Sequence, residues 1–254
     1  MMTTGIVVAF RRTVPLSRDC GFIGLCSKLV PTPSICEMGS SRESDGDETV
    51  DSSIAVKASC AWREALLTTV TEGYGRISMH GVRRELLTAQ ASSLGLPVEE
   101  VWIPKNSSNE TFEARMRNVL TRYKEKGIEE VAFGDLFLKD IRAHREERLA
   151  QIGMKGIFPL WGRDTAKLAR DFIETGFKAV LCCVDPRKLS KEFCGVEFDA
   201  ALLVSIPDSV DPCGENGEFH TFVYGGPIFS NEIQMTRGKV VPRDGFYFAD
   251  LIPF

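Results

Sequence analysis

Groups able to take part in acid–base or acyl chemistry are concentrated in one short segment near the C-terminal end of the sequence. Residues 214–221 carry two carboxylates, an amide, an imidazole and a hydroxyl: Glu215, Asn216, Glu218, His220 and Thr221. Gly214 and Gly217 let the backbone approach a ligand closely. Polar loops of this kind often hold binding and catalytic groups, but the same residues also suit a tight turn with solvated carboxylates. Both interpretations fit the residues alone.

The end of this segment enters a predicted strand at residues 219–224. Strand alternation places His220 and Phe222 on one face and Thr221 on the other. We therefore expect His220 and Thr221 to reach the same atom only if the strand is bulged.

A second candidate group lies where other predicted strands end. The apolar run at residues 130–133 ends on Gly134 and Asp135. Ligands of open α/β sheets bind outside the carboxyl ends of the strands, so this position suits a binding site. His80 stands at the entry to the first predicted helix, where it can bind a phosphate or a base, or simply cap the helix.

Short apolar runs alternate with amphipathic stretches of helical length, which is typical of successive β-α units. We predict strands at residues 65–70, 98–103, 130–133, 155–161 and 177–184, and helices at residues 81–94, 109–126, 139–150 and 164–175. The best-defined helix carries one apolar stripe made of Phe112, Met116, Val119, Leu120 and Tyr123. The helix at 139–150 is polar nearly all round, so it is either solvated or faces a ligand. After Asp199 this rhythm is lost, and we expect a smaller, partly antiparallel region.

Composition narrows the function classes. The chain has 254 residues, 43% of them hydrophobic, and a net charge of -4. Without a basic patch this charge argues against a nucleic-acid partner, and no apolar run reaches the roughly 20 residues of a membrane span. The eight cysteines include no C-x-x-C pair, so we predict no metal site and a reducing, cytoplasmic location. Cys182 and Cys183 lie in an apolar run and are predicted to be core residues.

The N-terminal region has a different composition. Residues 1–36 hold four basic residues and a single acid, Asp19, which resembles an organelle transit segment and gives an alternative location. The other interpretation, an unstructured extension without any address, is the one that this composition favours. Residues 37–53 are polar and acidic, as in a linker. We divide the chain into an extension at 1–59, a nucleotide-binding domain at 60–162 and a C-terminal substrate domain at 163–254.

Several segments together resemble the diphthine–ammonia ligase-like branch of the PP-loop ATP enzymes. The resemblance runs from about Leu66 to Phe254 and rests on residues 66–70, 78–85, 131–135, 140–146, 159–164 and 214–222. The motif Glu-Asn-Gly-Glu-Phe-His-Thr at 215–221 looks more like the bacterial-type relatives than the Glu-Gly-Gly-Glu-Tyr-Glu-Thr of the eukaryotic and archaeal ligases.

The resemblance implies a five-stranded parallel sheet of the HUP or PP-loop type, with a smaller C-terminal α+β domain. It implies that ATP, with magnesium, adenylates a carboxylate and that ammonia then displaces AMP to leave an amide. The substrate of the eukaryotic and archaeal ligases is diphthine on elongation factor 2, whereas the family name leaves the substrate of the bacterial-type relatives open. By the same resemblance the nucleotide side comprises Thr68, His80, Gly134, Asp135 and Arg142, and the acyl or ammonia side comprises Glu215, Asn216, Glu218, His220 and Thr221. The oligomeric state stays open.

The sequence departs from the family at the phosphate-binding loop. The first strand of the family ends in Ser-Gly-Gly-Lys-Asp-Ser, whose amides and lysine hold the pyrophosphate. The nearest counterpart, residues 44–49, has an acid in place of the lysine, and we interpret it as part of the linker. Two expectations follow. Either the first strand is missing or replaced and the chain is a non-catalytic nucleotide- or acid-binding module, or a different N-terminal sequence has been joined to a working ligase.

Overall fold

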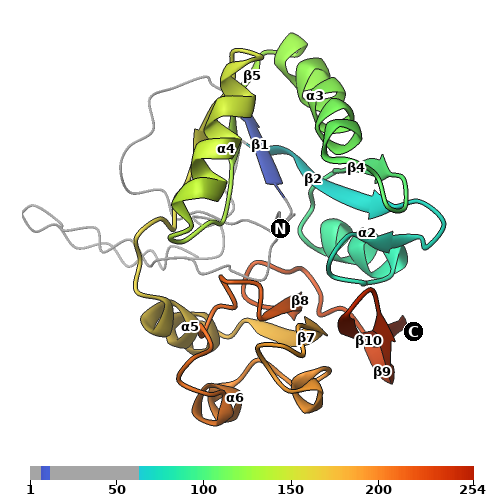
Figure 1. The fold of residues 1–254 in the computed structure, drawn as a ribbon, viewed down its shortest axis with the longest axis vertical. Coiled ribbons are helices and arrows are strands. Elements are labelled where there is room, and N and C mark those ends of the chain that lie inside the picture. Colours follow the sequence, from blue (N-terminus) through green and yellow to red (C-terminus); the bar gives the residue numbers. More distant parts are fainter. Residues whose placement is uncertain (1–6, 12–62) are drawn as a thin grey trace, which may run out of the picture.

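The computed structural model describes residues 7–11 and 63–254 of the chain (Figure 1). It is a mixed α/β structure with two sheets, one of six strands and one of four. The mixed α/β class and the C-terminal antiparallel sheet are confirmed, whereas the five-stranded parallel sheet is not. The predicted linker and the transit-like residues, apart from 7–11, lie outside the described residues.

The first sheet contains two parallel pairs joined by an antiparallel strand. Its strands are β1 (Val7–Arg11), β2 (Arg63–Thr71), β3 (Arg76–Ile77), β4 (Val98–Ile103), β5 (Ile128–Ala132) and β6 (Lys155–Ile157). β2 pairs in parallel with β4, and β5 pairs in parallel with β6. β1 lies between β2 and β5 and runs antiparallel to both.

β1 changes the interpretation of the N-terminal region. The sequence placed residues 7–11 in an extension, but this short run rich in β-branched and apolar residues forms a strand. The start of β1, and not its end, lies beside the carboxyl end of β5, because Val8 pairs with Ala132 and Arg11 pairs with Ile128. The central position of the sheet is therefore occupied by a strand of reversed direction.

The second sheet is antiparallel throughout. It is built from β7 (Lys178–Val184), β8 (Phe219–Gly225), β9 (Met235–Arg243) and β10 (Phe246–Pro253), in the order β8-β7-β10-β9. β7 was predicted as the fifth strand of the parallel sheet, and that prediction is wrong. β7 is central in the second sheet, and a central strand is buried on both faces whichever way its neighbours run.

Helices flank both sheets. They are α2 (Arg84–Ser93), α3 (Asn109–Glu125), α4 (Lys139–Ala150), α5 (Thr165–Glu174), the short α6 (Ala200–Ser205) and the 3₁₀ turn η1 (Lys191–Phe193). The predicted stripe of α3 packs against a core that includes Leu67 and Val131, as expected. Asp164 caps α5 by accepting a hydrogen bond from the Lys167 amide. Within the described residues, no helix has the length and apolar character needed to cross a membrane.

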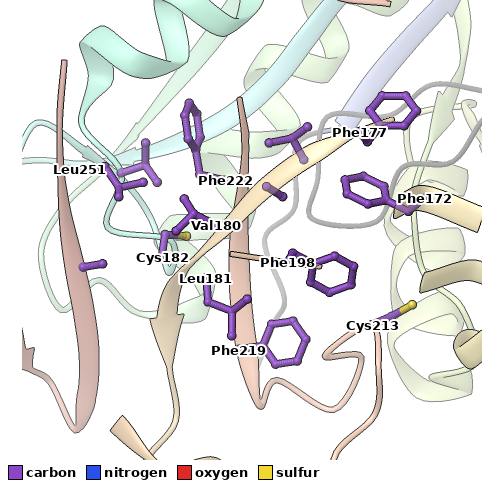
Figure 2. Packing of buried hydrophobic residues seen from close by; sticks show 14 of the residues in the cluster. Phe172, Phe177, Val180, Leu181, Cys182, Phe198, Cys213, Phe219, Phe222 and Leu251 are labelled. Carbon is purple, nitrogen blue, oxygen red and sulfur yellow. The ribbon is translucent and has the colours of Figure 1, made fainter. Parts of the chain in front are cut away.

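One apolar core connects the two sheets. It contains Leu66 of β2, Leu86 of α2 and Leu181 of β7. Figure 2 shows Phe172, Phe177 and Phe198 grouped beside the strands of the second sheet. Cys182 and Cys183 are fully buried, which confirms that they are core residues. The shared core fixes the position of β8 relative to the ends of β2 and β5.

Candidate functional site

The polar segment at 214–221 forms a tight turn that leads into β8. The Asp211 carboxylate accepts hydrogen bonds from the amides of Cys213, at 3.2 Å, and Glu215, at 2.7 Å. Gly214 has φ +66°, and a Cβ there would lie 2.8 Å from the Phe219 carbonyl oxygen, so only glycine fits. The turn was one of the two interpretations of this segment. The solvation expected with it is wrong, because Glu215 and Glu218 are each only 2% exposed.

Glu215 connects this turn to the Gly134–Asp135 segment. Its Oε1 accepts a buried hydrogen bond of 2.8 Å from the amide of Leu136, the residue that follows Asp135. A charged acceptor on a buried amide makes one of the stronger hydrogen bonds found in proteins. The two segments predicted to form the site therefore touch each other, although 79 residues separate the bonded pair.

Glu218 is held by only one of its two carboxylate oxygens. Oε1 accepts from the Asp211 amide at 3.1 Å and from the Asn216 side-chain amide at 3.0 Å. Oε2 is buried and has no hydrogen-bond partner in the described structure. The Glu218 carbonyl also accepts from the amide of Asp185, at 2.9 Å, which anchors the turn to the end of β7.

His80 and His220 meet across the junction of the two sheets. Their ring centroids are 4.6 Å apart, and each residue is only 6% exposed. The register between β7 and β8 shifts between Leu181 and Cys183, so the bulge lies in β7 and not in the strand that carries His220 and Thr221. The Thr221 hydroxyl is buried without a hydrogen-bond partner among the described residues.

The predicted nucleotide side lies at the ends of β2 and β5. The Thr68 hydroxyl, near the carboxyl end of β2, is buried and has no partner in the described part of the chain. Asp135 is 6% exposed, and its Oδ2 lies 3.0 Å from Nε of Arg145. Arg145 also stacks on Phe133, with its guanidinium carbon 4.4 Å from the ring centroid. Sequence analysis missed Arg145, although its place on the polar helix α4 was the available signal.

Arg142 is placed less directly. Its guanidinium carbon lies 4.7 Å from the ring centroids of both Phe158 and Trp161, and its Nε pairs with Glu146 at 2.9 Å. These contacts belong to α4 and the segment after β6. The structure therefore brings His80 to His220 and Asp135 to the Glu215 segment, while Arg142 makes its contacts elsewhere.

Asp250 of β10 fixes the turn that presents His80. Its carboxylate accepts hydrogen bonds from Arg76 at 2.8 Å and from Arg83 at 3.0 and 2.8 Å, and Arg76 also donates to the Gly81 carbonyl at 2.8 Å. The hydrogen bond from Arg83 is the main reason that the Asp250 pKa is lowered, and Arg76 adds to it. No local pattern could have found Asp250, because it lies 174 residues from Arg76.

Replacing Asp250 with asparagine is expected to lower the free energy of unfolding by about 1–2 kcal/mol at pH 7, because a bidentate, partly buried ion pair is lost. Since folding lowers this carboxyl pKa, the stabilisation is present above its usual value of 3.8 and disappears as the pH falls through the lower pKa of the folded protein. Urea unfolding of wild type and variant between pH 3 and 7 measures this difference. Asp171→Asn is the control, because Asp171 pairs with Lys167 and Arg163 at similar exposure but away from His80. Two results would contradict the stabilising role of Asp250: an equal loss of unfolding free energy in the two variants, or a difference between wild type and Asp250→Asn that grows at low pH.

Metal ligands are not gathered in the described part of the chain: no three His, Cys, Asp or Glu residues there are placed to hold one ion. The polar groups that the described residues do gather at the junction of the two sheets are buried carboxylates, imidazoles and hydroxyls.

Comparison with known proteins identifies relatives of this chain. Residues 164–248 match the family described as the diphthamide synthase C-terminal domain. The chain is 29% identical over 130 residues to the diphthine–ammonia ligase of Schizosaccharomyces pombe, in a match covering 50% of this chain and 21% of that protein. It is 31% identical over 137 residues to the diphthine–ammonia ligase of Mus musculus and 27% identical over 132 residues to that of Danio rerio. These matches cover 51% and 50% of this chain, and 50% and 51% of the two relatives. The chain thus spans about half the length of these two animal relatives, and less of the yeast protein.

Proposed function

We propose that this chain, a member of the diphthine–ammonia ligase-like family, binds ATP at the ends of β2 and β5 and forms an amide from a carboxylate and ammonia. The observation that carries the proposal is the buried hydrogen bond from the Leu136 amide to Glu215. It brings together the two segments that adenylation followed by amide formation requires, one for the nucleotide and one for the acyl group.

Two buried hydroxyls among the predicted site residues fit a ligand rather than a closed core. Buried polar groups in proteins are nearly always hydrogen-bonded, yet the Thr68 and Thr221 hydroxyls have no partner in the described structure. We assign Thr68, His80, Gly134 and Asp135 to ATP. The role of Arg142 rests on the family resemblance. Magnesium enters the proposal only with the ATP phosphates.

The acyl side of the proposal comprises the turn before β8 and the first residues of that strand. Glu215, Asn216, Glu218, His220 and Thr221 would surround the activated carboxylate. The names of the relatives point to diphthine as the first substrate to test, presented on elongation factor 2. His220 takes the position of a glutamate in the motif of the eukaryotic and archaeal ligases, so a carboxylate other than diphthine is the next candidate substrate.

A second candidate function is a non-catalytic module that binds a nucleotide or an acid. The direction of β1 favours it. A phosphate-binding loop that follows a strand must leave the sheet at the carboxyl ends of its parallel neighbours, and the carboxyl end of β1 lies at the opposite edge. ATP would then bind without being cleaved.

Calorimetry and ATP–pyrophosphate exchange on the full chain test both functions. We expect ATP binding, and pyrophosphate exchange that depends on elongation factor 2 carrying diphthine. Asp135→Asn should weaken ATP binding about 10- to 100-fold if it removes one charged hydrogen bond to the ligand, whereas the exposed Asp208→Asn should not. Binding without exchange would select the second function. No ATP binding at all would contradict the ligase function and the nucleotide-binding form of the second function.

A further inference from the structure

We propose that the unpartnered Oε2 atom of Glu218 is the binding point for an ammonium ion, and that Glu215 is a positioning residue. The catalytic meaning of this assignment rests on the proposed function, whereas the binding itself does not. The proposal gives different roles to Glu215 and Glu218, two carboxylates that lie three positions apart and are equally buried.

The carboxylate of Glu218 is incompletely satisfied. The residue is 2% exposed, and Oε2 has no hydrogen-bond donor in the described structure. An ionised oxygen removed from water without a donor is costly, typically by several kcal/mol. A ligand that supplies both N–H donors and positive charge would remove this cost.

The nearby protein donors are used elsewhere. The Asp211 amide and the Asn216 side chain both donate to Oε1, which fixes the plane of the carboxylate. Lys188 donates from Nζ to the Asn216 carbonyl, and Arg187 chelates Asp185 at 2.8 and 2.7 Å. The cations of this segment therefore stabilise the turn and leave Oε2 to a ligand.

Glu215 differs from Glu218 in how its oxygens are used. Its Oε1 accepts the Leu136 amide, and its own amide donates to Asp211. These bonds hold the turn against the Gly134–Asp135 segment. Glu215 therefore acts through the position of the turn, not through contact with the ammonium ion.

Ammonium fits Oε2 better than a metal ion does. A metal ion needs several oxygen or nitrogen ligands in a fixed geometry, and no such group is placed together in the described residues. Ammonium needs only hydrogen-bond acceptors, and Glu218 Oε2 is a buried acceptor without a partner in the described structure.

The same atom suits the amide-forming step. Glu218 Oε2 would accept one proton from ammonium and so release the nitrogen lone pair. That lone pair forms the C–N bond to the acyl adenylate, the bond from the acyl carbon to the AMP oxygen breaks with its electrons staying on AMP, and a second proton leaves the nitrogen for solvent. No oxidant or reductant is needed.

Thermal unfolding of the full chain in chloride salts tests ammonium binding without any catalysis. At equal ionic strength, saturating ammonium should raise the wild-type midpoint by about 3 °C over sodium or tetramethylammonium, which lacks N–H donors. Glu218→Gln keeps the size of the side chain but removes its charge and should abolish this difference. The exposed Glu232→Gln should keep it, and so should Glu215→Gln from a lower starting midpoint. An equal response of wild type and Glu218→Gln, or no ammonium-specific rise in wild type, would overturn the proposal.

A second variant and a second assay separate this proposal from the proposed function. If Glu218→Gln does not fold, Asn216→Ala can be used instead. It retains the Glu218 carboxylate but removes one of the two donors that fix its plane, so it should weaken the ammonium response. In an active protein, Glu218→Gln should raise the KM for ammonium at least tenfold, whereas the exposed Glu232→Gln should leave it unchanged. Loss of exchange in wild type contradicts the ligase function alone, whereas an unchanged KM in Glu218→Gln contradicts the ammonium assignment alone.

Discussion

Replacing Gly81 with alanine is expected to lower the free energy of unfolding by about 3–4 kcal/mol, the sum of a left-handed backbone cost and an overpacking cost. Gly81 has φ +68°, and an added Cβ would lie 2.3 Å from Cδ1 of Phe248 and 3.1 Å from Arg243. The Phe248 ring is buried and cannot turn away freely. Because His80 directly precedes Gly81, the same change should move His80 away from His220.

Gly75→Ala is the matched control for this prediction. Gly75 lies near the same turn with φ +59°, but a Cβ added there would have no other atom within 4 Å. Its replacement should cost about 1–2 kcal/mol, the backbone cost alone. Urea unfolding measures both variants, and imidazole NMR signals report the contact between the two histidines. Equal losses for Gly75→Ala and Gly81→Ala would show that the packing against Phe248 is unimportant.

Replacing Glu215 with alanine is expected to cost about 2–4 kcal/mol, because the Leu136 amide loses its acceptor and stays buried. Glu215→Gln retains an acceptor oxygen and should cost less. The exposed Glu232→Ala, which removes an ion pair with Lys178, should change stability by under about 0.5 kcal/mol.

Hydrogen exchange at the Leu136 amide gives a local measure of the same change. Glu215→Ala should remove the protection of this amide, while Glu215→Gln should retain most of it. Full protection in Glu215→Ala would mean that another group accepts the bond, and the connection between the two segments would then not depend on Glu215.

Features set by local patterns could be predicted from the sequence. The apolar stripe of α3 repeats at helical spacing, and its predicted members pack together against the core. The helix predicted at 164–175 begins at Asp164, a residue type that suits a helix cap, and Asp164 does accept the Lys167 amide. The prediction that Gly134 and Asp135 follow the end of a strand also depended only on the neighbouring apolar residues.

Strand pairing could not be predicted in the same way. The apolar run of β7 has the composition of a central strand, but composition does not say which sheet the strand enters or which way its neighbours run. β1 was missed because its five residues stand apart from any recognisable β-α unit, and its strand partners follow at residues 63–71 and 128–132.

Contacts across large sequence separations form the rest of the site. The links from Leu136 to Glu215, from His80 to His220 and from Arg76 to Asp250 each join segments far apart in the chain. The residue types at 214–221 suggested a site, but which oxygen of Glu215 and Glu218 is bound, and which is not, depends on those distant partners.

The antiparallel β1 also determines the order in which the first sheet can be completed during synthesis. Val7–Arg11 precedes the other described strands in the sequence, so it has neither partner until β2 has followed, and the sheet is not continuous until β5 has been made. Bringing together strands that lie so far apart in the sequence has an entropic cost that must be met before the pairing contributes to stability. The two parallel pairs can therefore form separately, and β1, although it precedes the other described strands, is among the last to gain both of its neighbours.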